Sequence, residues 1–380
     1  MRIGIDYTAA VRQCGGIGRY TRNLIRALAK LDAGNEYTLF AAGGWGEGDG
    51  FGSWPATFRV RSVPISDRWL HILWQRLRLP VPIQVVTGPL DLFHSPDFVL
   101  PPVGHTPAIL TVHDLSFLRA PQFFVPGFRQ YLEGAVSRAV GRARCILADS
   151  ESTRRDLIEL MGVVPERVSV IYPGVAPRFR PIRDAKALNR ARIRYDLPEW
   201  FVLGLGTLQP RKNFDGLIEA FGRLLTRSDV PGMENLHLVI VGGKGWMYEE
   251  TFAAVERAGL GKRVHFPGFV DDSDLPALYS LAAAFAFPSW YEGFGIPVLE
   301  AMACGTPVVA ADNSSLPEAM GQAGLMVDAG DADGLADVLV RLLTDESLRA
   351  RLVAAGKEQA QRFTWERAAQ QLFEVYRSFA

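Results

Sequence analysis

The chain has 380 residues, of which 48% are hydrophobic and 22% charged, a composition typical of globular proteins and unlike disordered, collagen-like or coiled-coil chains. Its 41 Lys and Arg equal its 41 Asp and Glu, which argues against a protein that binds polyanions over its whole surface. The charges are uneven, because residues 1–183 hold 22 basic and 15 acidic side chains and the remainder holds 19 and 26. Either two domains bind different partners, or the charges only keep the protein soluble.

The cysteines and the N-terminal segment indicate in which cellular compartment the protein is expected. Cys14, Cys145 and Cys304 are widely spaced and odd in number, so neither a disulfide framework nor a structural zinc site is predicted. The chain begins Met-Arg-Ile-Gly-Ile-Asp, without the apolar segment of a secretion signal. No apolar run reaches the roughly 18 residues of a membrane span. We therefore expect a cytoplasmic protein in a reducing environment.

Strand and helix signals alternate along the N-terminal half. A buried strand is predicted at residues 2–6, followed by a glycine-rich loop to Gly18 and a helix with apolar positions from Tyr20 to Leu31. Further strands are predicted at 37–41, 108–112 and 145–148. Short apolar strands that alternate with helices favour a parallel sheet covered by helices.

The stretch Arg68–Pro80 is different, because it mixes basic and aromatic residues. Leu70, Leu73, Trp74 and Leu77 share one face of a predicted helix, with Arg68, Arg76 and Arg78 nearby. Either this face packs into the core, or the helix lies on an anionic membrane surface. The basic surplus of the N-terminal half keeps the second alternative open.

The C-terminal half repeats the alternation. Strands are predicted at 201–205, 236–241, 264–267, 284–288 and 307–310. A helix is predicted from about Asp215 to Leu225, and residues 364–379 are predicted to form a helix capped by Thr364. The pattern predicts an α/β protein with two doubly wound domains in tandem. The boundary is expected in the proline-rich stretch Val170–Ile182.

Residues 289–300, Ser-Trp-Tyr-Glu-Gly-Phe-Gly-Ile-Pro-Val-Leu-Glu, carry the strongest chemical signal. A strand ends, a glycine-flanked loop follows, and Pro297 opens a short helix. A helix N-terminus at the carboxyl end of a parallel strand is an anion site. Glu292 in the loop and Glu300 in the first helical turn are suited to accept hydrogen bonds from hydroxyl groups. The plainer alternative is that Glu300 complements the helix dipole and Glu292 is solvated.

A second signal, Gly206-Thr-Leu-Gln-Pro-Arg-Lys-Asn213, follows another predicted strand. Arg211 can bind phosphate oxygens in pairs and Lys212 acts as a point charge, unless the two form only a solvated basic pair. Neither HExxH nor paired cysteines occur, so no catalytic metal is predicted. The charge of a bound phosphate would then be met by cations and the helix dipole.

In their order along the chain, the motifs resemble those of the retaining GT-B glycosyltransferases of family GT4, also called glycosyl transferases group 1. Glu292 and Glu300, with seven residues between them, look like the E-x7-E signature of the family. Three further segments resemble its glycine loop, its histidine position and its interdomain hinge: Gly15-Gly16-Ile-Gly-Arg-Tyr, Val112-His113-Asp114 and Val170-Ile-Tyr-Pro-Gly-Val175. The likeness spans nearly the whole chain and looks most like mannosyltransferases of bacterial polysaccharide and lipopolysaccharide assembly.

The resemblance implies two Rossmann-like domains with a cleft between them: 1–173 with 365–380 on the acceptor side, and 174–364 on the nucleotide-sugar side. It further implies a role for each matching residue. Glu300 would hold the ribose hydroxyls, Glu292 the sugar hydroxyls, and Arg211 and Lys212 the diphosphate.

The remaining carried-over roles concern backbone groups and one histidine. The amides of Gly293, Phe294 and Gly295 would orient the sugar and the diphosphate, while Gly15 and Gly16 would approach the phosphate. His113 would touch the transferred sugar, although without the family it would be interpreted as a structural histidine. Thr207 stands where many relatives carry a basic residue, and Val270 would contact the base.

The implied activity is metal-independent, retaining transfer of a hexose from a nucleotide sugar to a glycan or lipid-linked acceptor. GDP-mannose is the favoured donor and UDP-glucose the alternative; no other cofactor and no nucleic acid partner is expected. A nucleotide-sugar epimerase, a phosphorylase with lysine-bound pyridoxal phosphate and a non-catalytic sugar-nucleotide-binding protein are the rival classes. A lipid-linked acceptor would place the protein at the inner face of the membrane.

Overall fold

The structure is a computed structural model that describes residues 1–13, 15–45, 54–77, 79–226 and 232–380. The chain forms two compact units. The first comprises Met1–Leu118, Gly127–Gly174 and Thr364–Ala380, and the second comprises Arg119–Pro126 and Val175–Phe363. Cys14 and Arg78 lie outside the described residues, whereas Cys145 and Cys304 are free thiols. None of the helices within the described ranges combines the length and the apolar character that a membrane crossing requires.

A parallel sheet of seven strands, in the order β3-β2-β1-β4-β5-β6-β7, forms the centre of the first unit. The strands are β1 (Arg2–Asp6), β2 (Glu36–Ala42), β3 (Phe58–Val63), β4 (Leu92–Ser95), β5 (Ala108–Val112), β6 (Cys145–Ala148) and β7 (Val168–Val170). Strands β4 and β5 are buried throughout, as expected where helices cover both faces. The order reverses between β1 and β4, which makes this a topological switch point.

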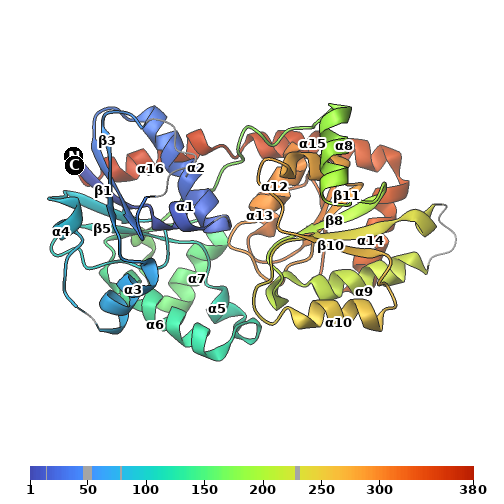
Figure 1. Cartoon of the computed structure of the whole chain (residues 1–380), viewed down its shortest axis with the longest axis horizontal. Helices are drawn as coiled ribbons and strands as arrows, with labels where there is room; N and C mark the ends of the chain where they lie inside the picture. Colours follow the sequence, from blue (N-terminus) through green and yellow to red (C-terminus); the bar gives the residue numbers. More distant parts are fainter. Residues whose placement is uncertain (14, 46–53, 78, 227–231) are drawn as a thin grey trace. The chain divides into compact units, whose positions relative to one another are not determined.

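Helices cover both faces of this sheet. They are α1 (Thr8–Arg12), α2 (Gly16–Leu31), α3 (Asp67–His71), α4 (Gln84–Thr87), α5 (Ser116–Arg119), α6 (Pro126–Arg142), α7 (Glu151–Met161) and α16 (Trp365–Arg377). Figure 1 shows α2 beside α16 on one face, with α6 and α7 on the other. Thr364 caps α16, as predicted, by accepting from Arg367 N at 3.2 Å. The Tyr376 hydroxyl of α16 lies 2.7 Å from His94 Nδ1 of β4, which ties the last helix to the sheet.

The expected loop up to Gly18 is wrong, because α2 already begins at Gly16. Gly18 does not break the helix but lets another helix approach it. A Cβ on Gly18 would lie 2.0 Å from the carbonyl oxygen of Gln13 and 2.8 Å from that of Ala9. Gly18 is therefore required where α1 packs against the first turn of α2.

The stretch Arg68–Pro80 is not one amphipathic helix. The short α3 is followed by a π-helical turn at Ile72–Arg76. Leu70 is buried, whereas Leu77 is 61% exposed. The predicted apolar face therefore packs against the unit at its start and faces solvent at its end.

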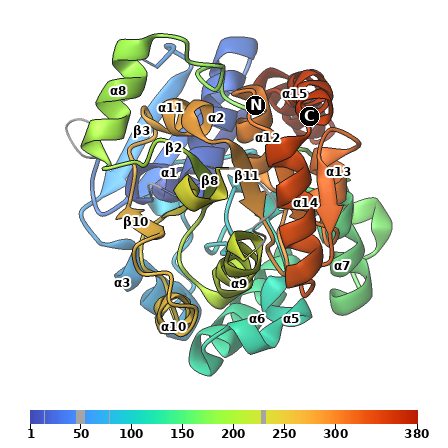
Figure 2. The same cartoon turned by 90° about the vertical axis from the view of Figure 1, so that its right-hand side faces the viewer.

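The second unit has a parallel six-stranded sheet in the order β10-β9-β8-β11-β12-β13. Its strands are β8 (Phe201–Leu205), β9 (His237–Val241), β10 (Val264–Gly268), β11 (Ala284–Phe287), β12 (Val308–Ala311) and β13 (Leu325–Val327). Its helices are α8 (Ala185–Arg194), α9 (Phe214–Leu225), α10 (Glu249–Arg257), α11 (Leu275–Leu281), α12 (Ile296–Ala303), α13 (Leu316–Met320), α14 (Ala332–Thr344) and α15 (Glu346–Gln361). In Figure 2, α9, α10 and α14 lie on one side of this sheet and α11, α12 and α15 on the other. Two doubly wound α/β units are thus present, which confirms the predicted fold class.

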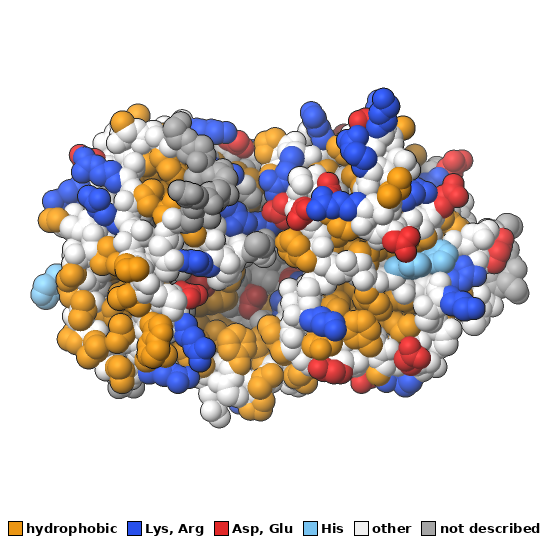
Figure 3. Space-filling view, viewed as in Figure 1, with side chains coloured by type: hydrophobic (Ala, Val, Ile, Leu, Met, Phe, Trp, Pro, Cys, Tyr) orange, Lys and Arg blue, Asp and Glu red, His pale blue; other side chains and the backbone are white. Residues whose placement is uncertain are grey.

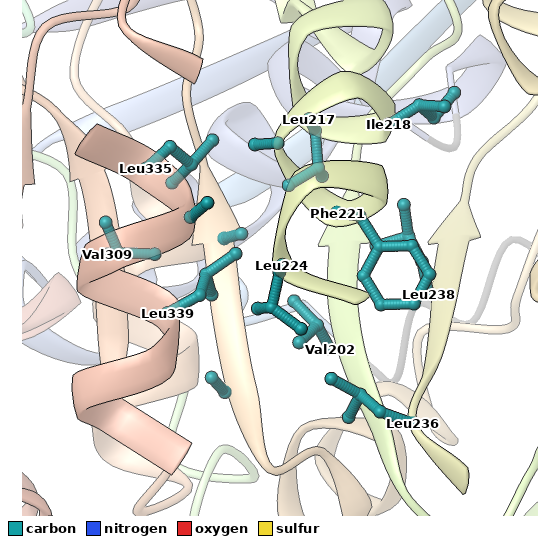
Figure 4. Close-up of a cluster of buried hydrophobic side chains, with 14 of the residues drawn as sticks. Val202, Leu217, Ile218, Phe221, Leu224, Leu236, Leu238, Val309, Leu335 and Leu339 are labelled. Carbon is teal, nitrogen blue, oxygen red and sulfur yellow. The ribbon is translucent and has the colours of Figure 1, made fainter. Parts of the chain in front are cut away.

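The core of the second unit lies between its sheet and the helices α9 and α14 (Figure 4). Leu217, Phe221 and Leu224 recur at helical spacing on α9 and are fully buried. They meet Leu335 and Leu339 of α14 above the strands. This packing fixes α9, and with it the loop that connects α9 to β8.

Candidate active site

A cluster of charged side chains lies at the carboxyl edge of the second sheet. Strands β8 and β11 are parallel neighbours, and the strand order reverses between them. Ligands of open α/β sheets bind outside the carboxyl ends of the strands at such a point. Gly206–Asn213 follows β8 and residues 288–295 follow β11, so the two predicted motifs meet although they are separated by 80 residues in the chain.

Arg211, Lys212 and Glu292 form a buried ion-pair cluster. Lys212 Nζ lies 2.6 Å from Glu292 Oε1, and Arg211 Nη1 lies 3.1 Å from Glu292 Oε2. The three side chains are only 9–12% exposed. Arg211 also donates to the carbonyl of Tyr291, and Lys212 Nζ lies 4.9 Å from the centre of the Phe287 ring. One carboxylate thus faces two cations within this cluster.

The electrostatics of the cluster keep Glu292 ionised. Burial alone would raise the pKa of its carboxyl group, but the charges of Arg211 and Lys212 outweigh burial and the pKa falls to about 2. The solvated carboxylate considered from the sequence is therefore wrong. Glu292 is the buried counter-ion that holds the two cations in place.

Three residues that the sequence analysis missed hold this cluster together. Asn213 Nδ2 donates to the carbonyls of Pro288 and Ala329, at 3.0 and 2.7 Å, and so joins the two loops. Ser314 Oγ accepts from Glu292 N at 3.0 Å, and Ser315 Oγ donates to Glu292 O at 2.8 Å. The available signals were the place of Asn213 at the end of the motif Gly206–Asn213 and the run Asn-Ser-Ser at 313–315, which begins three residues after the strand predicted at 307–310.

Helix α12 begins beside the cluster. Gly295, with φ 103°, precedes its eight residues, and Gly305, with φ 82°, follows it, as the predicted short helix requires. Glu300 lies in the second turn, not in the first as expected, because the helix begins at Ile296. It therefore does not complement the dipole from the first turn. Its buried carboxylate accepts from the Tyr279 hydroxyl at 3.3 Å.

The other predicted residues of this unit also follow strand ends. Thr207 is exposed after β8, and Val270 is buried after β10. Gly293 and Phe294 are buried in the loop before α12, and the Phe294 ring lies 5.3 Å from that of Phe363. One sheet edge thus carries Thr207, Arg211, Lys212, Val270 and the segment Glu292–Gly295.

Gly15 and Gly16 belong to the first unit. Gly15 precedes α2 and Gly16 is its first residue. A Cβ at either position would have no neighbour within 4 Å among the atoms that the structure describes. Packing therefore does not require glycine here, in contrast to Gly18.

His113 follows β5 in the first unit and is held on two sides. Its Nδ1 lies 2.8 Å from Asp149 Oδ2, and its Nε2 lies 3.2 Å from the carbonyl oxygen of Pro96. The rings of Tyr20 and Phe98 meet the imidazole edge-on, with centroids at 4.8 and 5.7 Å. Because a carbonyl only accepts, Nε2 carries a proton, and the Asp149 carboxylate accepts the proton of Nδ1.

The charge of His113 follows from these contacts. Burial alone would lower its pKa, but the neighbouring Asp149 carboxylate outweighs burial and raises the pKa to about 9. His113 is therefore a cation at neutral pH. The sequence analysis did not single out Asp149, whose only signal is its place directly after a predicted strand.

His94 has a structural role. It is fully buried, its Nε2 lies 2.9 Å from Thr111 Oγ1, and its Nδ1 contacts Tyr376. Burial and the neighbouring charge of His113 lower its pKa to about 3, so it is neutral. Across the ranges that the structure describes, no three His, Cys, Asp or Glu side chains gather in a way that could hold a metal ion.

Sequence comparisons identify relatives over both units. A family model described as Glycosyl transferases group 1 matches residues 186–359, and one described as Glycosyltransferase Family 4 matches residues 14–179. O-antigen chain mannosyltransferase B of Escherichia coli is 34% identical over 289 residues, which are 75% of this chain and 74% of that protein. Serotype-specific mannosyltransferase WbdA of Escherichia coli is 31% identical over 73% of this chain, but this match covers only 34% of WbdA. D-inositol 3-phosphate glycosyltransferase of Salinispora tropica is 36% identical over 76% of this chain and 64% of its own length.

Solved structures share the fold. Sucrose-phosphate synthase of Thermosynechococcus elongatus matches with a TM-score of 0.76 at 24% identity, over 100% of this chain and 98% of its own. WaaG, a glycosyltransferase involved in lipopolysaccharide biosynthesis, matches with a TM-score of 0.73 at 19% identity, over 99% of each chain. HepE of Anabaena, solved in complex with UDP and glucose, matches with a TM-score of 0.74 at 21% identity, over 99% of each chain.

Proposed function

The chain belongs to the glycosyl transferases group 1, within Glycosyltransferase Family 4, and from this premise we propose that it is a retaining, metal-independent hexosyltransferase. It takes the hexose from a nucleotide sugar and passes it to a glycan or a lipid-linked acceptor in polysaccharide or lipopolysaccharide assembly. The observation that carries the proposal is the buried cluster of Arg211, Lys212 and Glu292 beside the N-terminus of α12.

The cluster suits a nucleotide diphosphate as leaving group. Arg211 and Lys212 supply fixed positive charge, and the positive end of the α12 dipole, which follows Gly295, adds to it. The amides of Gly293, Phe294 and Gly295 orient the sugar and the diphosphate. Preorganised charges of this kind stabilise the charge that develops as the bond to the diphosphate breaks. Glu292 keeps the two cations in position and shares its oxygens with sugar hydroxyls. Glu300 holds the ribose, and Val270 contacts the base.

The proposed step is a front-face displacement. The acceptor oxygen bonds to C1 of the hexose on the side from which the diphosphate oxygen departs. That diphosphate oxygen takes the proton of the acceptor hydroxyl, so no protein carboxylate is needed as the base. Gly15 and Gly16 leave room for the phosphate, and the fixed charge of His113 contacts the transferred sugar. The products are a glycoside of unchanged anomeric configuration and a nucleoside diphosphate.

GDP-mannose is the proposed donor because relatives at 31–34% identity are named mannosyltransferases. The alternative is UDP-glucose, since a neighbour in fold was solved with UDP and glucose. Calorimetric titration with GDP, UDP and ADP distinguishes the two donors, and tight binding of UDP alone would contradict GDP-mannose. Mass spectrometry of the product with lipid-linked acceptors tests hexose transfer, and NMR of the new linkage tests retention. An inverted linkage would contradict the displacement above.

We further infer peripheral contact with an anionic membrane on the cytoplasmic side. Figure 3 shows hydrophobic side chains gathered over the part of the first unit where α3 lies. Trp69, Leu77 and Val85 are 60%, 61% and 73% exposed, and Arg68 and Arg76 are exposed in the same stretch. Exposed apolar side chains flanked by arginines suit an anionic lipid surface.

Vesicle flotation tests this contact. The protein should float with vesicles that contain phosphatidylglycerol, and less with purely zwitterionic ones. Trp69→Ala combined with Leu77→Ala should reduce flotation. Val164→Ala, which shortens another exposed side chain of this unit, is the matched control. Equal flotation of the double variant and the control would contradict the assignment.

A further inference from the structure

The segment Arg119–Pro126, here called the strap, belongs to the second unit although it connects two helices of the first. In the chain it lies between α5 and α6, but in space it forms one unit with Val175–Phe363. A single 3₁₀ turn, Pro121–Phe123, folds the strap, and Phe124 follows with an extended backbone. The two neighbouring phenylalanines reach two different loops of the second unit.

Both phenylalanine rings of the strap contact a tryptophan. The Phe123 ring stacks on the Trp290 ring, with centroids 5.9 Å apart and planes at 23°. The buried Phe124 ring lies 5.6 Å from the Trp246 ring. In addition, Trp246 Nε1 donates to the Phe123 carbonyl at 2.7 Å. Aromatic pairs at these distances attract each other beyond the burial of their area. The strap is therefore attached to the second unit at two places.

The two tryptophans lie on either side of the loop that carries Arg211 and Lys212. Trp246 follows β9, Trp290 follows β11, and the two cations follow β8. In the sheet, β9 and β11 are the two neighbours of β8. The strap thus joins the loops that flank the β8 loop at the carboxyl edge of the sheet.

Backbone hydrogen bonds connect both tryptophan loops to the β8 loop. Trp290 N donates to Arg211 O at 2.9 Å, and the Arg211 guanidinium donates to the carbonyl of Tyr291. On the other side, Gly245 N, one residue before the second tryptophan, donates to Leu208 O at 3.0 Å. The positions of the two tryptophan loops therefore set the course of the β8 loop at both of its ends.

We propose that Phe123 and Phe124 are positioning residues of the donor site, which hold the two tryptophan loops in the arrangement that binds the diphosphate. The inference rests on the proposed function and adds the strap to its site. Neither phenylalanine touches the nucleotide in this proposal. If the loops adopt the binding arrangement only part of the time, the affinity for the ligand falls by that fraction. Loss of one aromatic pair should therefore weaken nucleotide binding while the protein still folds.

Calorimetry with the full chain tests this effect on affinity. Phe123→Ala should raise the Kd for GDP about threefold to tenfold, the magnitude of one lost aromatic pair. Phe123→Tyr keeps the ring and should bind like the wild type. The matched control is Val125→Ala, which shortens a 42% exposed side chain of the same strap and should also bind like the wild type. Trp246→Phe removes the hydrogen bond to the strap and should weaken binding too, which keeps the test valid if Phe123→Ala fails to fold.

Fluorine NMR of fluorotryptophan-labelled protein separates positioning from mere packing. The signal of Trp290 is identified by its loss in Trp290→Phe. In Trp246→Phe, which leaves the Phe123 ring in place, this signal should shift because the strap is less firmly attached. Saturating GDP should then bring the signal to its position in the GDP-bound wild type, since ligand binding and attachment of the strap favour each other. A packing contact without a positioning role would give a displaced signal that GDP does not restore.

The failure of this inference can be told apart from the failure of the proposed function. If the wild type binds UDP instead of GDP, the same comparison is made with UDP. A wild-type protein that binds neither of these nor ADP would overturn the proposed function, and the role of the strap with it. A wild type that binds a nucleotide, with an unchanged Kd in both Phe123→Ala and Trp246→Phe, would overturn the role of the strap alone. Equal weakening in Val125→Ala and Phe123→Ala would overturn it as well.

Discussion

Glu292→Gln is the substitution that most directly tests the buried cluster. It leaves Arg211 and Lys212 in place but removes the charge that both of them face. The fall in the pKa of Glu292 from 4.5 to about 2 corresponds to about 3 kcal/mol in favour of the ionised carboxyl. Loss of one partner of a buried ion pair typically costs about 3–5 kcal/mol. We therefore expect a loss of about 3 kcal/mol in stability at pH 7.

The pH dependence of this loss provides a second test. A carboxyl group with a depressed pKa stabilises the fold above its unfolded value, near 4.5, and this contribution disappears as the pH falls through about 2. The difference in Tm between wild type and Glu292→Gln should thus be constant from pH 7 to 5 and shrink toward pH 2. Calorimetric melts across this range measure it.

The stability of Glu292→Gln should fall, but its affinity for GDP should rise. Because the variant keeps both cations and loses their counter-ion, GDP should raise its Tm more than it raises that of the wild type. Turnover should nevertheless fall, since the cations and the sugar lose the group that positions them. An equally stable variant with an unchanged response to GDP would show that Glu292 does not hold the cations, and the reasoning above would be refuted.

Three further predictions concern neighbouring groups and the core. Lys212→Ala should weaken GDP binding about tenfold or more in calorimetry, and unchanged affinity would remove Lys212 from the site. Asp149→Asn should lower the pKa of His113 from about 9, which NMR titration would follow. Because the stability from the charged His113 is complete below pH 6.5 and disappears as the pH rises through about 9, the deficit of Asp149→Asn should be largest below pH 6.5; a deficit independent of pH would argue against the ion pair. Phe221→Ala should cost about 3–5 kcal/mol in denaturant unfolding of the second unit, whereas Phe269→Ala, at a 57% exposed ring, should change stability by less than about 0.5 kcal/mol.

Strands made of continuous apolar residues could be predicted closely from the sequence. The predicted bounds of β5, β6 and β8 agree with the structure, because each is a buried run. Four strands, β3, β4, β7 and β13, were missed, and β3 and β4 were missed for identifiable reasons. In β3, Phe-Arg-Val-Arg-Ser-Val at the sheet edge leaves both arginines exposed. In β4, His94 and Ser95 suggest a polar loop, yet tertiary partners such as Tyr376 satisfy their buried polar groups.

The candidate site likewise contains residues that could be predicted from the sequence and contacts that could not. Arg211, Lys212 and Glu292 could be singled out because motif and local context agree. Their mutual contact could not be foreseen, since it depends on the order of strands β8 and β11 in the sheet. Asp149 was missed because a lone carboxyl after a strand has no distinctive spacing. Its importance comes from a histidine 36 residues away in the chain.

The passage of the chain through the first unit has a consequence for biosynthesis. This unit is assembled from three separate segments, the last of which, Thr364–Ala380, brings Tyr376 to His94. The segments of the other unit end at Phe363. During translation, most of the first unit leaves the ribosome first, but its core is completed only when α16 has been synthesised. The second unit, in contrast, is complete once Phe363 has been added. Nascent chains that stop before Trp365 should consequently expose an incomplete N-terminal half to chaperones and proteases.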